Sequence, residues 1–209
     1  MQLEVLQATR SFRGRTVFSD FDATFPGNAV TALVGPSGSG KSTLLAALAG
    51  IERLDSGHVR LCDRDGSTRA PTADQFAWIS QHSNALPART ALDNVLIGPL
   101  SRGTDLVTAQ LLATEALQAV GLEALTNRPL LDFSGGERQR VCFARAIASG
   151  RDFILADEPS SSLDAENTRR LARILESLQT RVTIIVATHD PVMMSAAEIV
   201  ISMRPERRA

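Results

Sequence analysis

The sequence predicts an α/β fold with a mainly parallel sheet, a small antiparallel β layer and a helical insertion. In the C-terminal half, short apolar runs rich in β-branched residues alternate with helix-like stretches, as parallel strands joined by crossover helices do. Near the N-terminus the apolar runs lie closer together, which favours an antiparallel layer. From about residue 82 to 134 the strand pattern stops, and the chain is interpreted as mostly helical.

The length fits one folding unit. The chain has 209 residues, of which 44% are hydrophobic and 22% charged, enough to bury a substantial core. We expect a single domain over residues 1–209, with the core and the antiparallel layer formed by 1–80 and 135–209 and a helical subdomain at about 82–134. The arginine-rich end, 204–208, is interpreted as a solvated tail.

Each expected element has a local signal. Strands are predicted where β-branched and other apolar residues cluster: 3–6, 29–34, 59–62, 76–79, 153–156, 182–187 and 199–201. Helices are predicted over 41–49, 105–120, 137–149 and 165–178. The first three of these helices are followed directly by Gly50, Gly121 and Gly150, a common way for a helix to end.

Charge and apolar patterning exclude several classes of protein. Twenty-two Lys and Arg against 23 Asp and Glu give a net charge of −1, so no overall field attracts nucleic acid or anionic lipid, and no nucleic-acid partner is expected. No apolar run approaches the roughly 20 residues that span a bilayer, and the first residues lack a secretory pattern, which predicts a cytosolic chain. Cys62 and Cys142 lack metal-ligand neighbours and are predicted to be reduced, inert thiols.

A glycine-rich loop follows the apolar run 29–34 and opens the next helix. Backbone N–H groups of such a P-loop converge on phosphate oxygens, helped by the helix dipole. Lys41 can reach the β and γ phosphates, and the Ser42 hydroxyl can coordinate Mg²⁺, so ATP or GTP is the implied ligand. A plain Gly/Ser turn is disfavoured because strand, loop, Lys-Ser pair and helix agree. The loop comprises Gly35, Pro36, Ser37, Gly38, Ser39, Gly40, Lys41, Ser42 and Thr43.

Two acids end the apolar run 153–156. Asp157 is predicted to hold Mg²⁺ through water, and Glu158 to orient and deprotonate an attacking water. Acids are common at strand ends, so this interpretation depends on the P-loop upstream.

The segment FSGGERQR at 133–140, together with the P-loop and ADEPSSSLD, resembles the ATP-binding cassette family over nearly the whole chain. The family's signature usually begins with Leu, where this chain has Phe133, and Glu137 replaces Gln, as it does in many members. Both residues keep the required character, which is an apolar anchor followed by a polar side chain in the first turn of the helix. Ser134, Gly135 and Gly136 at a helix start form a second phosphate-receptive surface. The resemblance implies that this surface contacts the γ phosphate held by the opposite subunit of a homodimer.

The same resemblance implies further roles, each beside an ordinary structural alternative. Gln81 matches the glutamine that senses Mg²⁺ and water, in a loop that meets the membrane partner, although a Gln after a strand is often a polar cap. Asp164 matches a residue at the dimer interface and is also a helix N-cap candidate. His189 matches the switch histidine near the γ phosphate, and Phe12 the aromatic that stacks on adenine, with Phe18 as alternative and a core role open for either ring.

The resemblance implies an ATPase that binds ATP and Mg²⁺, dimerises head to tail and drives separate transmembrane permease subunits at the cytoplasmic face of the membrane. GPSGSGKSTLL and SGGERQRV are most similar to the MacB-like and LolD-like exporters of lipoproteins, antibiotics, peptides or haem. An FtsE-like regulator that transmits force to cell-wall enzymes stays open. A soluble ATPase acting on nucleic acid or ribosomes is disfavoured, because the chain has neither a coiled-coil insertion nor a second cassette.

Overall fold

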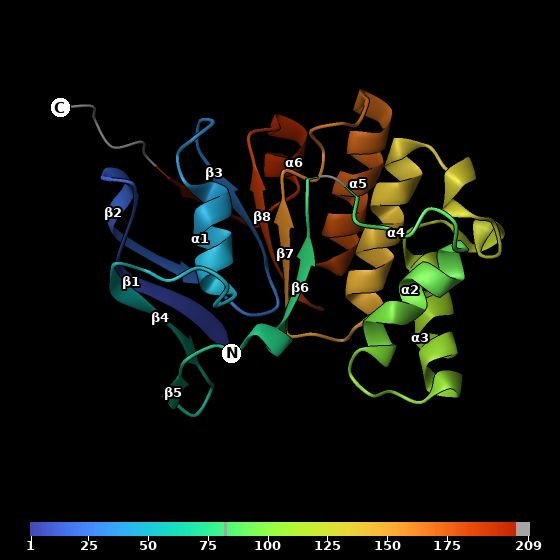
Figure 1. The fold of residues 1–209 in the computed structure, drawn as a ribbon, viewed down its shortest axis with the longest axis horizontal. Helices are drawn as coiled ribbons and strands as arrows, with labels where there is room; N and C mark the ends of the chain where they lie inside the picture. The colour runs from blue at the N-terminus through green and yellow to red at the C-terminus, as the bar shows by residue number, and fades with distance from the viewer. Residues whose placement is uncertain (82, 204–209) are drawn as a thin grey trace.

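A computed structural model describes residues 1–81 and 83–203, so the interpretation of the arginine-rich tail lies outside the described residues. The chain forms two sheets and a group of helices (Figure 1), which confirms the expected fold class. The five-stranded sheet is parallel, in the spatial order β6 (Phe76–Ile79), β7 (Phe153–Asp157), β8 (Thr183–Thr188), β3 (Val30–Val34) and β9 (Ile199–Ser202). The four-stranded sheet is antiparallel, in the order β2 (Arg15–Phe25), β1 (Gln2–Phe12), β4 (Ser56–Cys62) and β5 (Thr68–Arg69).

Helices pack against the parallel sheet and against one another, and short 3₁₀ turns lie in the connections between elements. The helices are α1 (Lys41–Leu48), α2 (Ala91–Leu100), α3 (Leu106–Ala119), α4 (Gly135–Ala148), α5 (Ala165–Leu178) and α6 (Pro191–Ser195). The 3₁₀ turns are η1 (Ala73–Gln75), η2 (Glu123–Leu125) and η3 (Leu130–Asp132).

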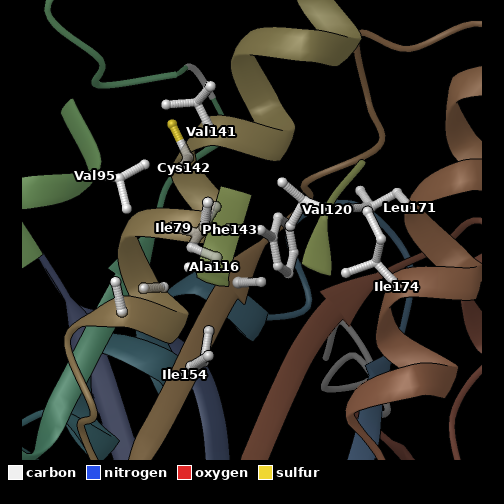
Figure 2. Close-up of a cluster of buried hydrophobic side chains, with 14 of the residues drawn as sticks. Ile79, Val95, Ala116, Val120, Val141, Cys142, Phe143, Ile154, Leu171 and Ile174 are labelled. Atoms are coloured by element: carbon white, nitrogen blue, oxygen red, sulfur yellow. The ribbon is translucent and has the colours of Figure 1, made fainter. Parts of the chain in front are cut away.

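Both faces of the parallel sheet are buried, which explains the continuous apolar runs in the sequence. Alternate side chains of β7 show this directly. Phe153 and Leu155 belong to a cluster shared with α1 and the antiparallel sheet. Ile154 belongs to the cluster on the other face, where it lies among side chains of the helices, Phe143 included (Figure 2).

The register of the central strands brings three segments of distant sequence to one edge. Val34 at the end of β3 pairs with Thr188 of β8, and Asp157 at the end of β7 pairs with Ala187. The loops that follow these strands are therefore neighbours at the carboxyl edge of the sheet, where ligands bind in open α/β sheets.

The structure extends several expected elements and adds others. β1 runs to Phe12 rather than stopping at Leu6, because β2 pairs along its length. β2 itself, β5 and α6 had not been predicted, whereas α2 lies inside the region interpreted as helical. α4 starts at Gly135 instead of residue 137, because Ser134 accepts a hydrogen bond from the Glu137 amide and so caps the helix.

Candidate active site

The P-loop surrounds the start of α1 with a shape that only glycine allows. Gly38 and Gly40 have φ angles of 79° and 92°, in the left-handed region. A Cβ on Gly40 would lie 2.6 Å from Cγ1 of Val17 and 2.9 Å from Cδ1 of Phe18. Gly40 is also the N-cap of α1 and has no side chain to accept from the first-turn amides, which suits a helix start that receives an anion.

The Lys41 ammonium is buried within its own loop. Nζ donates to the carbonyl oxygens of Gly35, at 2.9 Å, and Pro36, at 3.3 Å, and lies 3.2 Å from Oε1 of Glu158. A fixed cation beside a glycine-rich cradle fits a polyphosphate chain, whose oxygens would compete with the Glu158 carboxylate for the ammonium.

Ser42 and Asp157 form the oxygen pair that a hard cation requires. The Ser42 hydroxyl donates to Oδ1 of Asp157 over 2.9 Å. Burial raises the pKa of Asp157, the Ser42 hydrogen bond lowers it, and the Glu158 charge raises it further. A hydroxyl and a carboxylate beside a phosphate cradle fit Mg²⁺, which takes one or two carboxylates together with substrate phosphates.

Glu158 points away from Asp157 because its backbone turns. Its φ is 45°, an uncommon conformation for a residue other than glycine, and its N–H donates to the Ala187 carbonyl at 2.9 Å. The carboxylate lies between Lys41 and His189, whose Nδ1 is 3.0 Å from Oε2. Its side chain is only 16% exposed, whereas that of His189 is 70% exposed and open to solvent.

A pocket of about 350 Å³ unites most of the predicted residues. It contains P-loop residues together with Gln81, Glu158 and His189, and Asp157 reaches it through Ser42. The residues that form its wall are Val17, Ser37, Gly38, Gly40, Lys41, Ser42, Thr43, Gln81, Glu158, Ser161 and His189. Val17 and Ser161 had no predicted role. Val17 carries no motif signal, while Ser161 lies inside the ADEPSSSLD segment, which could have indicated it.

The segment that begins α4 forms a separate surface. Ser134 and Glu137 bond reciprocally, and the Ser134 N–H lowers the pKa of the Glu137 carboxyl. Gly136 packs against Asn167 so closely that a Cβ would overlap it. Asn167 is in turn bonded to both carboxylate oxygens of Asp164, at 2.8 and 3.0 Å. The two predicted interface segments therefore lie together.

That surface is absent from the wall of the 350 Å³ pocket, among the residues that the structure describes. In Figure 1 the P-loop and the start of α4 lie at the same end of the molecule, the end toward which the parallel strands point, but on different sides of it. No side-chain atom shields Gly135, which has open space where a Cβ would stand. One chain thus presents two phosphate-receptive surfaces, but not in one pocket.

The two candidate adenine-stacking rings differ in exposure. Phe12, at the end of β1, is 43% exposed, and the Arg10 guanidinium lies 4.3 Å from its ring centroid. Phe18 is 3% exposed and packs edge-on against Phe21 beneath the P-loop, so it offers no open face to a base. Neither ring lines the pocket.

A family model described as ABC transporter matches residues 18–161. The chain belongs to this family. It carries the family's ATPase domain, and among the described residues no helix is long and apolar enough to cross a membrane.

Relatives with curated names include both import and export proteins. The chain is 38% identical over 205 residues to the Fe(3+) ions import ATP-binding protein FbpC of Streptomyces coelicolor, which covers 97% of this chain and 59% of that protein. It is 35% identical to the macrolide export ATP-binding/permease protein MacB of Salmonella choleraesuis, over 96% of this chain and 33% of that protein. The chain therefore spans between a third and three fifths of these relatives, and they do not single out the expected exporter branch.

Solved structures of cassettes match the whole fold. The dimeric structure of MJ0796, a bacterial ABC transporter cassette, is 25% identical with a TM-score of 0.80 and covers 98% of this chain and 97% of its own. A dimeric post-hydrolysis state of the same cassette, bound to ADP and Pi, is 25% identical, covers the same shares and gives a TM-score of 0.79.

Proposed function

We propose that this chain is the ATP-hydrolysing subunit of an ABC transporter and drives conformational change in separate transmembrane subunits. The observation that carries the proposal is the Glu158 carboxylate, held between Lys41 and His189 at the mouth of the P-loop pocket. A carboxylate so placed, beside a phosphate cradle, is suited to accept a proton from an attacking water.

In this proposal each group of the pocket has one task. The P-loop amides and Lys41 bind the phosphates of ATP, and Phe12 stacks on adenine. Ser42, Asp157 and Gln81 hold Mg²⁺, which when bound neutralises charge on the phosphates. Glu158 then exchanges its contact with Lys41 for one with water, while His189 keeps the other carboxylate oxygen in place.

We further propose that two copies complete the site. Ser134, Gly135, Gly136 and Glu137 of one copy would face the nucleotide bound by the other, with Asp164 at the interface. The separation of the two surfaces within one chain supports this arrangement, as does the dimeric state of the similar MJ0796 cassette. ATP then acts as a bridge that hydrolysis removes.

The permease is proposed to dock near the loop after Gln81, which places this chain at the cytoplasmic face of the membrane. A groove of about 360 Å³ lies there, between η1, β6, α2 and α4, and includes Trp78, Asn84, Ile97 and Arg145. The groove borders the helices of the proposed subdomain, residues 82–134. Nothing in the site favours a nucleic-acid partner.

The direction of transport is proposed on the sequence pattern as export of the MacB or LolD type. Similarity to MacB over 96% of the chain supports export, and similarity to FbpC over 97% supports import. The alternative without cargo, an FtsE-like force transmitter, uses the same ATPase pocket. Identification of the membrane protein that co-purifies with this chain in detergent distinguishes an exporter, an importer and a force transmitter.

A pair of variants tests the ATPase proposal. Glu158→Gln keeps the shape of the side chain but removes the base. Turnover should therefore fall about 10²- to 10⁴-fold, while calorimetry still detects ATP binding. Lys41→Ala removes a charge-assisted contact to phosphate, and binding itself should weaken about 10- to 100-fold.

Glu166→Gln is the matched control, because this carboxylate lies exposed on α5 and pairs with Arg170. Its turnover should equal that of the unaltered chain. Near-normal turnover of Glu158→Gln would show that Glu158 is not the base. Unchanged ATP affinity of Lys41→Ala would contradict the proposal that Lys41 and the P-loop bind the phosphates.

A further inference from the structure

The loop after Gln81 is attached to α2 through a buried side chain. Asn94, which is fully buried in α2, accepts a hydrogen bond from the Leu86 N–H at 2.6 Å. Its Nδ2 donates back to the Leu86 carbonyl at 3.0 Å and to the Thr90 carbonyl at 2.9 Å. These paired bonds fix the path of the loop at Leu86.

A second attachment joins the same loop to α4. Nη1 of Arg145 donates to the carbonyl of Asn84 at 3.3 Å, and Nη2 donates to Oδ1 of the same residue. The thiol of Cys142 lies 3.9 Å from that Oδ1. Cys142 and Arg145 are three positions apart on one face of α4, so both side chains contact Asn84. We call the Arg145–Asn84 contact the clasp.

The clasp lies close to the nucleotide pocket along the chain. Gln81 lines the pocket, and Asn84 is three residues further on. Three residues of fully extended chain span about 10 Å, so the position of Asn84 limits where Gln81 can go. Asn84, Cys142 and Arg145 also line the groove of about 360 Å³, so the clasp touches both the groove and the segment that enters the pocket.

We propose that Arg145 is a positioning residue, which acts through Asn84 to hold Gln81 at the Mg²⁺ side of the pocket. This inference rests on the proposed function. The guanidinium suits the task because its fixed fork holds a carbonyl and an amide oxygen of one residue at once. Since α4 also begins at the Ser134 surface, a displacement of α4 moves Gln81 with it.

Arg145→Met tests the proposal, because it keeps the length of the side chain and removes its donors. The affinity of the ATP-bound chain for Mg²⁺ should fall about 3- to 30-fold, a range typical of changes along a coupling network. Calorimetry in a Glu158→Gln background measures this affinity without turnover. Hydrogen exchange of the amides at 83–86 should also accelerate. The affinity for ATP in the presence of EDTA should not change.

Arg102→Met is the matched control, because Nη1 of Arg102 donates to the Ser149 carbonyl, at 3.3 Å, and to the Gly150 carbonyl, both directly after the C-terminal end of α4. It removes a comparable arginine-to-carbonyl contact of the same helix without touching the loop. Its Mg²⁺ affinity should match that of the Glu158→Gln background.

A second variant distinguishes loss of the clasp from a folding defect in Arg145→Met. Asn84 is exposed, so Asn84→Ala should fold normally and lower the Mg²⁺ affinity as Arg145→Met does. The double variant should be no weaker than Arg145→Met, because Asn84→Ala removes only the side-chain part of the contact that Arg145→Met removes in full. The proposed role of the clasp would be overturned if the Mg²⁺ affinity of Arg145→Met and Asn84→Ala were unchanged. It would also be overturned if these variants lost affinity for ATP in EDTA as much as they lost affinity for Mg²⁺. Failure of the proposed function would give different results from failure of the clasp. In that case ATP would not bind the unaltered chain, or Glu158→Gln would retain turnover.

Discussion

Asp157 and Glu158 are adjacent in sequence, but the backbone gives them different surroundings. Asp157 ends β7 and is bonded to Ser42, whereas the left-handed turn at Glu158 directs its carboxylate toward Lys41 and His189. In the proposed function, Asp157 serves the cation and Glu158 the water. Strain of this kind is kept at functional sites because the surrounding structure holds it.

The raised pKa of Asp157 gives a prediction about stability and pH. Burial disfavours the charged carboxylate, so the folded chain binds this proton more readily than the unfolded chain, and stability is lost as pH rises through the folded pKa. Without Mg²⁺, Asp157→Asn should therefore unfold a few degrees higher than the unaltered chain at pH 8.

Thermal unfolding followed by circular dichroism at several pH values measures this difference. The gain should shrink toward low pH, where Asp157 is protonated in both states. A gain that is equal at all pH values, or a loss at pH 8, would mean that the charge of Asp157 is not the cause. Added Mg²⁺ with ATP should stabilise the unaltered chain more than Asp157→Asn, because the variant lacks a carboxylate for the cation.

Site residues that match a motif could be predicted from the sequence, whereas a residue outside every motif could not. The P-loop spacing placed Lys41 and Ser42 in the phosphate pocket, where the structure has them. Val17 gave no signal, because its contact with the pocket arises only when β2 folds against Gly40. The sequence offered Phe12 as the ring that stacks on adenine and Phe18 as the alternative, and in the structure Phe12 is exposed whereas Phe18 is buried.

At the scale of elements, α4 holds its neighbours through arginines on different sides. Arg138 donates to the carbonyls of Leu130 and Leu131, and Arg145 grips the loop at Asn84. Arg140 is buried, and its Nη1 donates to the carbonyls of Val120, at 3.1 Å, and Gly121, at 3.3 Å, at the end of α3. Orphan carbonyls at that helix end are thereby satisfied.

Arg140→Met should destabilise the chain by about 1–3 kcal/mol, because it leaves the carbonyl of the buried Val120 without this donor. Urea unfolding measures the change. Arg173→Met on the exposed side of α5 is the control and should change the free energy of unfolding by less than about 0.5 kcal/mol. Equal effects of the two variants would show that the buried contact is not a support for α3.

Elements with buried faces were predictable, and those defined by pairing were not. The runs 153–156 and 182–187 are apolar on both faces, so β7 and β8 were evident from the sequence. β2 carries Asp20 and Asp22 on exposed positions and has no continuous apolar run, so its pairing with β1 defines it. β5 has two residues, too few for any periodic signal.

At the scale of the whole molecule, one end of the chain presents the two surfaces that we propose as halves of a nucleotide site. The P-loop before α1 and the segment that begins α4 lie on different sides of that end, as Figure 1 shows. A second copy related by a twofold axis would bring each half against the other's complement. The sequence predicted the P-loop half from its own residues and the contact of the Ser134 surface with the opposite subunit by resemblance, and the folded chain shows that the two surfaces share no pocket within one copy.

Complementation between two inactive variants tests this shared site most directly. Lys41→Ala disables the P-loop, and Gly135→Asp should disable the other half by placing a charge where open space now lies, at a helix start where an acid does not harm folding. Each variant alone should hydrolyse little ATP. An equimolar mixture should regain roughly a quarter of normal activity, because half of the dimers are mixed and each has one intact site. Full activity of Gly135→Asp alone, or a mixture as inactive as its components, would contradict a nucleotide site shared between two copies.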